Sequence, residues 1–562
     1  MEHLLYFLPD NKPKKEVDIL LITGDVFIDH PSFGIAIIAR VLEANGYSIC
    51  IASQPEYFNK EYINILPTPK LFVGISSGNL DSVVANYSGN RNTRKEDSYC
   101  IDGNGLFANG QKRRPDRATI VYTSFIKQKF KEIPVVLGGL EASIRRFSHY
   151  DFVQQKLRKS ILVDSKADIL VYSMGEKAIV EIAKKIKEKE SLLGIKGTVI
   201  RCGKIDDQIL IQNPLNLPSF SEIEQNKDLL LTATQLIEEN MVFDKASILI
   251  QNQTDISVVS FPPQPPLTED EMDFIYSLPF QKDKPDYCER VPAWNMIKDS
   301  ITVHRGCYGK CSFCAITSHQ GSIISKRSKK SVIDEVQKLV KTNFFKGTIT
   351  DLGGPTANMY GTYCKIGYCK NPNCLYPELC KNLIIDKNIY KNLLCEVKKI
   401  EGVKNVFVSS GLRHDLALLK KEETEFIITN CTSGHLKIAP EHINEKVLNL
   451  MCKPKNQVFI EFIEFFEEIK KKNHLKFYFL PYIILSFPGS NEESVKELGN
   501  FLNKYNIRTY QYQDFTPVPQ TMATAMFYCG KDLSGKKINT LSPSVLSNSQ
   551  REILKKYLTG SK

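Results

Sequence analysis

Short apolar runs alternate with stretches of helical periodicity along the first 200 residues. The runs that we expect to be strands are 17–23, 48–52, 70–75, 135–137 and 169–172. Helical periodicity fills the intervals between them, for example at 34–45 and 176–187. This alternation predicts an α/β fold with a doubly wound, Rossmann-like sheet, because parallel strands need crossover helices that cover both faces.

Two of these expected strands end in glycine-rich turns that lead into helical segments. One turn begins with Thr23-Gly24-Asp25 and continues through Asp29-His30-Pro31-Ser32-Phe33-Gly34. The other is Gly138-Gly139-Leu140-Glu141-Ala142-Ser143. Ligands of open α/β sheets bind beyond the carboxyl ends of the strands. We therefore expect this half of the chain to bind a substrate or to close an active site at that edge.

The middle of the chain is less regular and contains a proline-rich connector. The segment 261–267 holds four prolines in five positions, which neither a helix nor a central strand accommodates. We therefore expect four regions along the chain. They are a first domain (1–200), a connecting region (201–294), a second α/β domain (295–535) and a C-terminal tail (536–562).

The second α/β domain repeats the strand–helix pattern six times. The expected strands are 300–303, 347–351, 405–409, 435–438, 477–485 and 510–515. Polar residues or glycines follow these strands. Six such strands predict a partial (β/α)6 barrel, whose site lies at the carboxyl ends of the strands.

Three cysteines lie close together at the start of this second domain. Cys307, Cys311 and Cys314 have a C-x3-C-x2-C spacing, with Phe313 directly before the last thiol. Thiolates on a short loop select iron–sulfur centres or zinc over hard cations. In a four-iron cluster, three cysteines leave one iron free to bind another ligand. The alternative from the residues alone is a zinc loop that a distant Cys or His completes.

A second set of cysteines follows about fifty residues later. Its members are Cys364, Cys369, Cys374 and Cys380. Four thiols within seventeen residues, with Pro372 and Pro377 enforcing turns, predict a metal site. Zinc sites usually contain C-x2-C pairs, which this spacing lacks. An auxiliary iron–sulfur cluster and a structural zinc are therefore both expected candidates.

The overall charge permits a polyanionic partner. The chain has 74 Lys and Arg against 63 Asp and Glu, a net charge of +11, and RNA phosphates draw on clustered basic residues. Much of the excess is lysine scattered through helical segments. The densest basic cluster, at 111–117, is interpreted either as a nucleic-acid contact or as a polar loop.

We expect neither a targeting signal nor a membrane span. Charges follow a short apolar patch within the first 18 residues, and the longest apolar run, 477–488, is interrupted by Pro481. These features favour a cytoplasmic protein without membrane contact. In that compartment clustered cysteines serve metal or redox chemistry more often than disulfides.

The three-cysteine segment resembles the signature of the radical S-adenosylmethionine (SAM) enzymes. Gly353 and Gly354 follow it by about forty residues at an expected strand end. They resemble the Gly-Gly motif whose backbone meets the amino group of SAM, although Pro355 stands where many members have glutamate. The segment 487–489 resembles a strand that contacts the ribose and adenine.

Longer motifs are similar to those of the YgiQ family of radical SAM proteins. They are 24–34, 139–143, 304–307, 318–321, 353–360 and 436–442, together with the second cysteine set. The resemblance covers about residues 15–530. It implies a [4Fe–4S] cluster and SAM as cofactors, and it implies no particular substrate.

The resemblance also assigns expected roles to individual residues. The cluster ligands are Cys307, Cys311 and Cys314; the SAM contacts are Phe313, Gly353, Gly354, Ser410 and Gly489; the candidate catalytic residues are Arg413, Lys437 and Glu441. A reduced flavodoxin- or ferredoxin-type protein is the expected electron donor.

The first domain resembles the cobalamin-binding domain that precedes many radical SAM modules. Domains that ligate cobalt through histidine carry D-x-H-x-x-G, whereas His30 follows Asp29 directly here. The histidine is thus one residue too early. We expect a domain of the same fold that closes the site or binds substrate, and cobalamin bound without that histidine stays open.

These observations together predict a radical SAM enzyme. It would cleave SAM reductively to a 5′-deoxyadenosyl radical and abstract hydrogen from a substrate lodged between the two domains. RNA, a small metabolite and a peptide are the candidate substrates. One alternative is a non-catalytic iron–sulfur scaffold or sensor, which would need no seat for methionine. Another is a binding protein with zinc at both cysteine sets.

Overall fold

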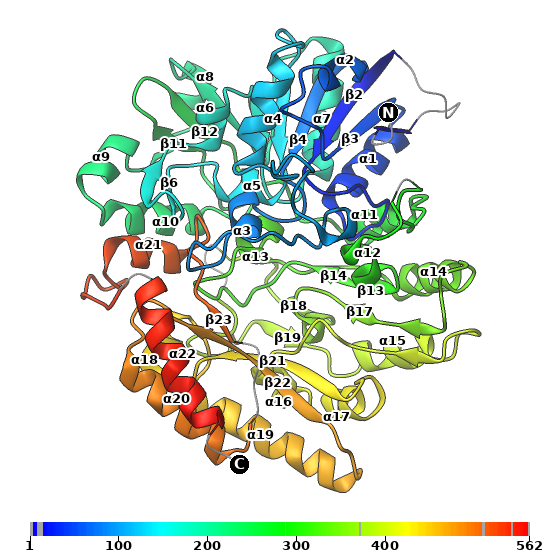
Figure 1. Ribbon diagram of the computed structural model, residues 1–562, viewed down its shortest axis with the longest axis vertical. Coiled ribbons are helices and arrows are strands. Elements are labelled where there is room, and N and C mark those ends of the chain that lie inside the picture. The colour runs from blue at the N-terminus through cyan, green and yellow to red at the C-terminus, as the bar shows by residue number, and fades with distance from the viewer. Residues whose placement is uncertain are drawn as a thin grey trace.

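The computed structural model describes residues 4–7, 15–286, 288–369, 373–507, 512–540 and 543–559. Within these residues ten strands form one large sheet in the order β1-β3-β2-β4-β5-β8-β9-β12-β11-β10 (Figure 1). The strands are β1 (Leu4–Phe7), β2 (Glu16–Thr23), β3 (Ile49–Ser53), β4 (Thr68–Ser76), β5 (Val135–Gly138), β8 (Ile169–Val171), β9 (Thr198–Cys202), β10 (Leu215–Asn216), β11 (Leu249–Asn252) and β12 (Ser257–Ser260). The neighbours β3, β2, β4, β5 and β8 are parallel, as the alternating pattern predicts.

Strands β9, β12 and β11 continue the same sheet in antiparallel fashion. The sheet therefore extends beyond residue 200, into the region that we expected to be a connector. The proline-rich segment 261–267 follows β12 and has no regular secondary structure, in keeping with its composition.

Helices cover both faces of the large sheet because its central strands are apolar on both sides. Ile19 and Leu21 of β2 pack into a core with α1 and α7, whereas Leu20 and Ile22 pack into a second core with α4 and α6. The helices of this half are α1 (Gly34–Ala44), α2 (Tyr62–Ile65), α3 (Ser82–Asn86), α4 (Ala118–Lys127), α5 (Gly139–Ile144), α6 (Ile161–Ser165), α7 (Glu176–Glu188), α8 (Asp207–Leu210), α9 (Phe220–Gln225), α10 (Leu229–Glu239) and α11 (Glu269–Ser277). A short hairpin, β6 (His149–Asp151) with β7 (Lys156–Arg158), lies outside the sheet.

The second half is a barrel of parallel strands that lies below the sheet in Figure 1. Its strands are β13 (Ser300–Thr302), β16 (Thr348–Ile349), β17 (Asp351–Gly353), β20 (Asn405–Val406), β21 (His435–Glu441), β22 (Tyr478–Leu485) and β23 (Tyr512–Asp514). Parallel pairing runs from β13 to β17, from β16 to β20, and from β21 through β22 to β23. A parallel bridge from Leu412 to Ile438 joins the two parts. The expected partial (β/α)6 barrel is confirmed, with residues 510 and 511 of its last expected strand outside the described residues.

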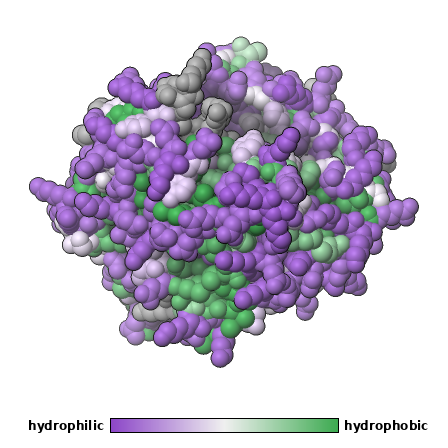
Figure 2. Space-filling model, turned by 90° about the horizontal axis from the view of Figure 1, so that it is seen from below, coloured by the Kyte–Doolittle hydropathy of each residue, from purple (hydrophilic) through white to green (hydrophobic). Residues whose placement is uncertain are grey.

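Eleven described helices belong to the second half. They are α12 (Pro292–Ile297), α13 (Ile316–Gln320), α14 (Lys329–Val340), α15 (Ile389–Val397), α16 (His414–Leu419), α17 (Lys421–Asn430), α18 (Glu445–Leu450), α19 (Asn456–Lys472), α20 (Glu492–Lys504), α21 (Met522–Cys529) and α22 (Pro543–Thr559). Of these, α14, α15, α16, α17, α19, α20 and α22 bury one continuous core against the strands. Gly499 of α20 lets the ring of Tyr557 on α22 approach its backbone, since a Cβ there would lie 2.5 Å from that ring. The barrel end of the molecule is largely hydrophilic, with hydrophobic side chains gathered in a central strip (Figure 2). No described helix has both the length and the apolarity needed to cross a bilayer.

The carboxyl edge of the large sheet meets the carboxyl face of the barrel. Ser143 Oγ at the end of α5 lies 2.9 Å from Nδ1 of His319 on α13. Nearer β23, the Asn90 side chain donates a hydrogen bond of 3.0 Å to Asp514. Because the carboxyl ends of strands carry the ligand sites in both kinds of fold, this junction brings two such sites together.

Candidate active site

The three-cysteine loop leaves the barrel after β14 (His304–Arg305) and runs to α13. Gly306 begins it with φ +86°, and a Cβ at this position would collide with the Ile323 carbonyl, so the turn requires glycine. The Cys307 N–H donates to the Gly321 carbonyl at 3.1 Å, and the Ser312 N–H donates to the Met451 carbonyl at 3.1 Å. The barrel therefore fixes the loop at both its start and its middle.

The three thiols influence one another. Burial raises the pKa of Cys314 to about 12, and the neighbouring sulfurs of Cys311 and Cys307 add to this shift. Burial raises the pKa of Cys307 as well. These thiols are thus protonated at neutral pH when free, and iron binding must release their protons. Three soft, mutually close sulfurs fit an iron–sulfur cluster with one open iron.

Among the residues described, no three His, Cys, Asp or Glu side chains gather as tightly as a single metal ion requires. Each cysteine of a four-iron cluster binds a different iron, so such a cluster needs a wider spacing of its thiols than a single ion does.

Arg413 stands beside the cysteine loop. Its Nη1 lies 3.7 Å from Cys311 Sγ, while Nε and Nη2 form a bidentate pair with Asp415 at 3.0 and 2.6 Å. Burial alone would lower the pKa of Arg413, but the charges of Asp415 and Cys311 outweigh it and raise the pKa. Asn358 holds the Arg413 backbone through two hydrogen bonds. A rigid positive group is therefore aimed at one predicted cluster ligand, as a thiolate site favours.

The glycine pair lies at the end of β17. A Cβ at Gly353 would collide with Ser410 Oγ, and a Cβ at Gly354 would lie 2.6 Å from the ring of His304. Ser410 donates from its N–H and its hydroxyl to Asp351 at 3.0 and 3.2 Å. Burial raises the pKa of Asp351, and these hydrogen bonds oppose that shift. Ser410 and Asp351 thus leave no room for a side chain at Gly353, and His304 leaves none at Gly354.

Strand β21 supplies the two remaining predicted catalytic residues. The positive charge of Lys437 opposes the rise that burial causes in the pKa of Asp351, so this lysine lies near Asp351 at the glycine pair. Glu441 is 9% exposed and has φ +68°, an uncommon backbone conformation for glutamate. Burial raises its pKa, against the opposing charges of Lys453, 3.8 Å away, and Arg413. The barrel therefore brings Glu441 and Arg413 to the cysteine loop, and Lys437 and Ser410 to the glycines.

Phe313 and Gly489 lie in different surroundings. Phe313 packs edge-on against Phe487, with ring centroids 6.3 Å apart, in an apolar cluster at the ends of β22 and β23. Gly489 has φ +87°, and its N–H donates to the Asn539 carbonyl at 2.7 Å. A side chain at Gly489 would collide with Leu450. The tight turn explains the glycine, and its role toward SAM stays a prediction.

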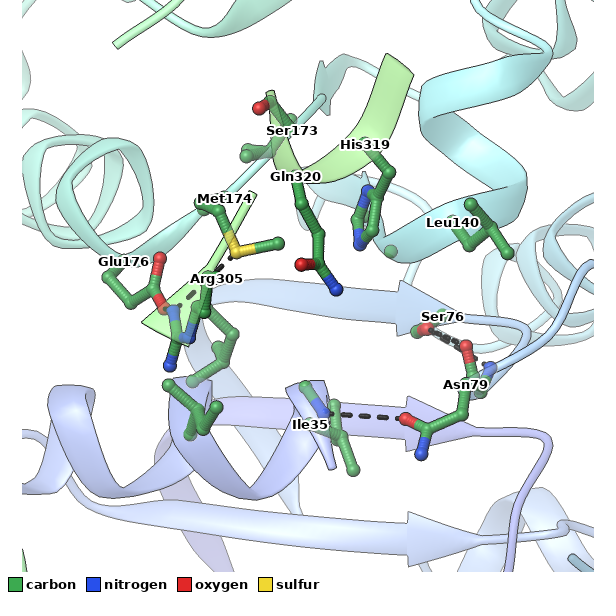
Figure 3. A pocket seen from close by; sticks show the side chains of 18 of the residues that line it. Ile35, Ser76, Asn79, Leu140, Ser173, Met174, Glu176, Arg305, His319 and Gln320 are labelled. Atoms are coloured by element: carbon green, nitrogen blue, oxygen red, sulfur yellow. Dashed lines mark hydrogen bonds and ion pairs between the residues drawn. The ribbon is translucent and has the colours of Figure 1, made fainter. Parts of the chain in front are cut away.

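A cavity of about 470 Å³ lies between the two halves. Its sheet wall contains Ser76, Asn79 and Leu140 from strand ends and turns, and its barrel wall contains Gly354. The polar ends of His319 and Gln320, which follow the cysteine loop, point into it (Figure 3). The cavity therefore reaches from the glycine pair to the carboxyl edge of the large sheet.

An ion pair crosses the junction at this cavity. Arg305, which directly precedes Gly306 and the cysteine loop, pairs with Glu176 at the first turn of α7. Its Nε also donates to the Tyr276 hydroxyl at 3.2 Å. Arg305 belongs to a motif that the sequence singled out, but nothing in the sequence marked Glu176 as its partner.

The second cysteine set lies against the first. It forms an excursion framed by the short pair β18 (Thr362–Cys364) and β19 (Leu383–Ile385). Cys374 packs into an apolar cluster with Tyr308 from the first loop, and the Tyr308 hydroxyl donates to Thr362 Oγ1 at 2.8 Å. Burial and the neighbouring thiols raise the pKa of Cys374 to about 12. Pro372, one of the two expected turn residues, lies outside the described residues.

Asp29 and His30 hold the turn after β2. Asp29 pairs with Arg40 and accepts a hydrogen bond of 3.0 Å from the Gln281 N–H. His30 is 1% exposed, and its Nδ1 accepts a hydrogen bond of 3.0 Å from the Ser32 N–H. Neither residue lines the cavity between the two halves.

Sequence comparisons match both halves of the chain. Residues 10–300 match the family model described as Radical SAM N-terminal, and residues 301–502 match the model of the Radical SAM superfamily. The chain is 43% identical over 568 residues to a UPF0313 protein of Thermotoga neapolitana, covering 97% of this chain and 98% of that protein. It is 40% identical over 570 residues to UPF0313 protein CLJ_B0249 of Clostridium botulinum strain 657, covering 98% and 87%.

Solved structures share the architecture. The radical SAM methyltransferase TsrM from Kitasatospora setae, with tryptophan and aza-SAM bound, superimposes with a TM-score of 0.53 at 12% identity, covering 96% of this chain and 89% of that one. TsrM with cobalamin and a [4Fe–4S] cluster bound gives a TM-score of 0.52, also at 12% identity, covering 97% and 89%. At this level of identity the likeness shows a common fold.

Proposed function

Because the chain belongs to the radical SAM superfamily, and within it to the UPF0313 or YgiQ family, it is a radical SAM enzyme, and we propose that Cys307, Cys311 and Cys314 hold its [4Fe–4S] cluster. When bound, this cluster supplies the electron that splits SAM into methionine and a 5′-deoxyadenosyl radical. The observation that carries the proposal is the loop itself. Its three thiols are mutually close and are fixed by the barrel, with Arg413 aimed at Cys311.

We propose that the glycine pair seats the methionyl end of SAM. Gly353 and Gly354 offer backbone N–H and C=O groups with no Cβ in the way, and Ser410 stiffens the turn through Asp351. Phe313 lies in the apolar cluster at the strand ends, where an adenine would find apolar contact. These residues bind and orient SAM, which is the share of the chemistry that falls to the protein.

The substrate enters the cavity between the two halves in this proposal. The cavity begins at Gly354, so a substrate bound there lies next to the methionyl seat. Arg413, Lys437 and Glu441 orient the substrate or SAM from the barrel side. His319 and Gln320 line the opposite approach from the cysteine loop. The sheet wall excludes water from the reacting groups, which a radical reaction requires.

At the second cysteine set we propose an auxiliary iron–sulfur cluster rather than the zinc ion that the sequence also allows, because the described thiols are not gathered as tightly as a single ion requires. The thiols of this set lie close to one another. Besides burial, the neighbouring sulfurs raise the pKa values of Cys369 and Cys374. A flavodoxin- or ferredoxin-type protein supplies the electrons.

An RNA substrate draws no support from the basic segment 111–117. Lys112 pairs with Asp116 at 2.7 Å, Arg114 is 1% exposed and pairs with Asp25 at 2.8 Å, and Arg117 pairs with Asp151 at 2.6 Å. These charges are neutralised within the protein. The net charge of +11 is what supports RNA among the candidate substrates.

We also propose that His30 does not ligate cobalamin. Asp29 and His30 are committed to the turn after β2 and do not line the cavity. Reconstitution with hydroxocobalamin followed by gel filtration tests this. We expect that the absorption spectrum of the protein fraction shows no cobalamin with a histidine bound to cobalt.

The decisive test is 5′-deoxyadenosine formation by the anaerobically reconstituted protein with SAM and a strong reductant. The Cys307/Cys311/Cys314→Ala protein is the blank. Product above the blank supports the proposed ligands. Equal product from both proteins would refute these ligands. No product from a wild-type protein whose cluster is confirmed by iron content and spectrum would refute the proposed SAM cleavage.

A further inference from the structure

Seven arginines are buried in the described part of the chain, and six of them face a carboxylate. The six pairs are Arg40–Asp29, Arg114–Asp25, Arg145–Asp81, Arg305–Glu176, Arg327–Glu335 and Arg413–Asp415. The seventh, Arg146, is 1% exposed and has no carboxylate within ion-pair distance among the described residues. A buried charge is costly unless another group compensates it. Arg146 therefore lacks a counterion that the folded chain gives to its other buried arginines.

Neutral groups surround the Arg146 guanidinium. Nη1 donates to the Ser143 carbonyl at 2.5 Å and to Gln520 Oε1 at 2.7 Å, and Nη2 lies 3.2 Å from the thioether of Met241. Nε is buried without a hydrogen-bond partner. The ring of Tyr172 lies 4.5 Å from the guanidinium carbon. A thioether is a weak acceptor, so several of the five donors are poorly used.

The charge of the adjacent Arg145, in contrast, is compensated by a carboxylate. It is also 1% exposed, but it forms a bidentate pair with Asp81 at 2.6 and 2.9 Å. Burial lowers the pKa of Arg146 to about 10, whereas at Arg145 Asp81 outweighs burial and raises the pKa. The two neighbouring arginines are equally buried, but the protein supplies a carboxylate partner to Arg145 and, among the described residues, none to Arg146.

Both polar partners of Arg146 lie one contact from the candidate active site. Ser143 places its hydroxyl 2.9 Å from His319 Nδ1, and His319 lines the cavity between the two halves. Gln520 is three residues before Ala523, whose N–H donates at 2.8 Å to the Ser312 carbonyl inside the cysteine loop. The uncompensated charge thus lies where the first half, the cysteine loop and the end of the barrel meet.

We propose that Arg146 binds an anionic group of the substrate, a phosphate or a carboxylate, and that the side chains of Met241 and Gln520 move aside to admit it. An oxyanion would accept the donors that the thioether uses poorly, and its charge would neutralise the guanidinium. Gln520 Nε2, which is also buried without a partner, offers a further donor. The inference rests on the proposed function, since it names the chemical class of the substrate. Arg146 does not line the cavity itself, and Ser143 connects it to His319, which does.

The first test compares Arg146→Met with Arg145→Met in the full-length reconstituted protein, without phosphate or carboxylate in the buffer. Replacing an uncompensated buried charge with an apolar side chain of similar length should leave the Tm unchanged or raise it by about 2–4 °C. Arg145→Met should lower the Tm, because it leaves Asp81 buried without its partner. A fall in Arg146→Met as large as that in Arg145→Met would mean a structural role and would overturn the proposal.

The second test measures anion binding by the Tm of the same proteins. Sodium phosphate and sodium acetate are titrated separately against sodium chloride of equal ionic strength. We expect one of the two anions to raise the wild-type Tm by about 2–4 °C, and that rise to be lost in Arg146→Met. The effective anion identifies the group as phosphate or carboxylate. No rise with either anion, or an equal rise in both proteins, would overturn the proposal.

A third arm repeats the titration with saturating SAM. A rise that persists supports a substrate site, and a rise that SAM abolishes would assign Arg146 to the SAM carboxylate and overturn the proposal. None of these measurements reads SAM cleavage. Their failure would leave the proposed function standing, and a failure of 5′-deoxyadenosine formation would leave the anion site standing.

Discussion

The two cysteine regions lie against each other but are held in different ways. The three-cysteine loop is fastened by hydrogen bonds to Gly321, Met451 and Ala523, which belong to three different segments of the chain. The four-cysteine excursion has its two-stranded frame, β18 and β19, and exposes Tyr363, Ile366 and Leu379 to solvent by 60%, 58% and 45%. The barrel therefore fixes the three-cysteine loop through its own contacts. For the four-cysteine excursion, we propose that a bound metal supplies the stability that the chain alone does not.

The largest difference between the two regions should appear when one thiol is removed from each set. Cys314→Ala should reduce 5′-deoxyadenosine formation to the level of the triple-alanine blank, because only two ligands stay on the loop. Cys374→Ala should retain part of the SAM cleavage and lose stability or substrate turnover. Complete loss of cleavage in a folded Cys374→Ala protein would show that the two sites do not divide the work.

A smaller effect should come from adding one methyl group to a glycine in each region. Gly354→Ala places a Cβ 2.6 Å from the His304 ring, so we expect at least a tenfold loss of SAM cleavage, about 1.4 kcal/mol. Gly367→Ala meets nothing within 4 Å and pays only for its φ of +77°, about 1 kcal/mol of stability. Rates and Tm values measured side by side check both. Equal rates in the two variants would mean that the glycine pair is not a seat for SAM.

Metal removal should affect the two regions unequally. After chelation of the Cys307/Cys311/Cys314→Ala protein, trypsin should cut at Lys365 or Lys381 in the four-cysteine excursion several-fold faster than before. The reason is that this segment has few buried contacts of its own. Mass spectrometry of the fragments locates the cuts. An unchanged rate at these two lysines would show that the excursion is held without metal.

The smallest effect should come from the contact that joins the two regions. Tyr308→Phe removes the hydrogen bond to Thr362 Oγ1 and keeps the ring in place, so we expect a loss of about 1 kcal/mol in unfolding free energy. Chemical denaturation measures it. The same substitution in the Cys374→Ala background tests whether the contact depends on the second site. A smaller loss of unfolding free energy there would show that it does.

Local periodicity was enough to predict most of the strands that position the site. The expected strand 70–75 corresponds to β4 (Thr68–Ser76), and 477–485 corresponds to β22 (Tyr478–Leu485). Side chains of a buried parallel strand are apolar over its whole length, which makes such strands visible in sequence. Strands β9 to β12 were not recognised as part of the same sheet, since pairing between β8 and β9 depends on contacts outside each strand.

The candidate site was predictable only where spacing along the chain carries the chemistry. The cysteine loop and the glycine pair are local patterns, and in the folded chain Gly354 lies against His304, which precedes the cysteine loop. Arg146 was missed because its distinguishing property is the absence of a carboxylate, and Gln520, one of its partners, is 374 residues away. The basic segment 111–117 was ambiguous for the same reason, since the pairing of Arg114 with Asp25 appears only in the folded chain.

The ion pair between Arg305 and Glu176 has a consequence for how the protein is made. Glu176 precedes Arg305 by 129 residues, so at roughly 5–20 residues per second the ribosome releases it about 6–26 s earlier. The last strand of the large sheet in chain order, β12, is also synthesised before the cysteine loop. Glu176 and the described strands of the large sheet are therefore synthesised before the cysteine loop, so Glu176 is available to Arg305 when that loop leaves the ribosome. The half of the enzyme that is made first thus carries the ion-pair partner of the residue that leads into the proposed cluster loop.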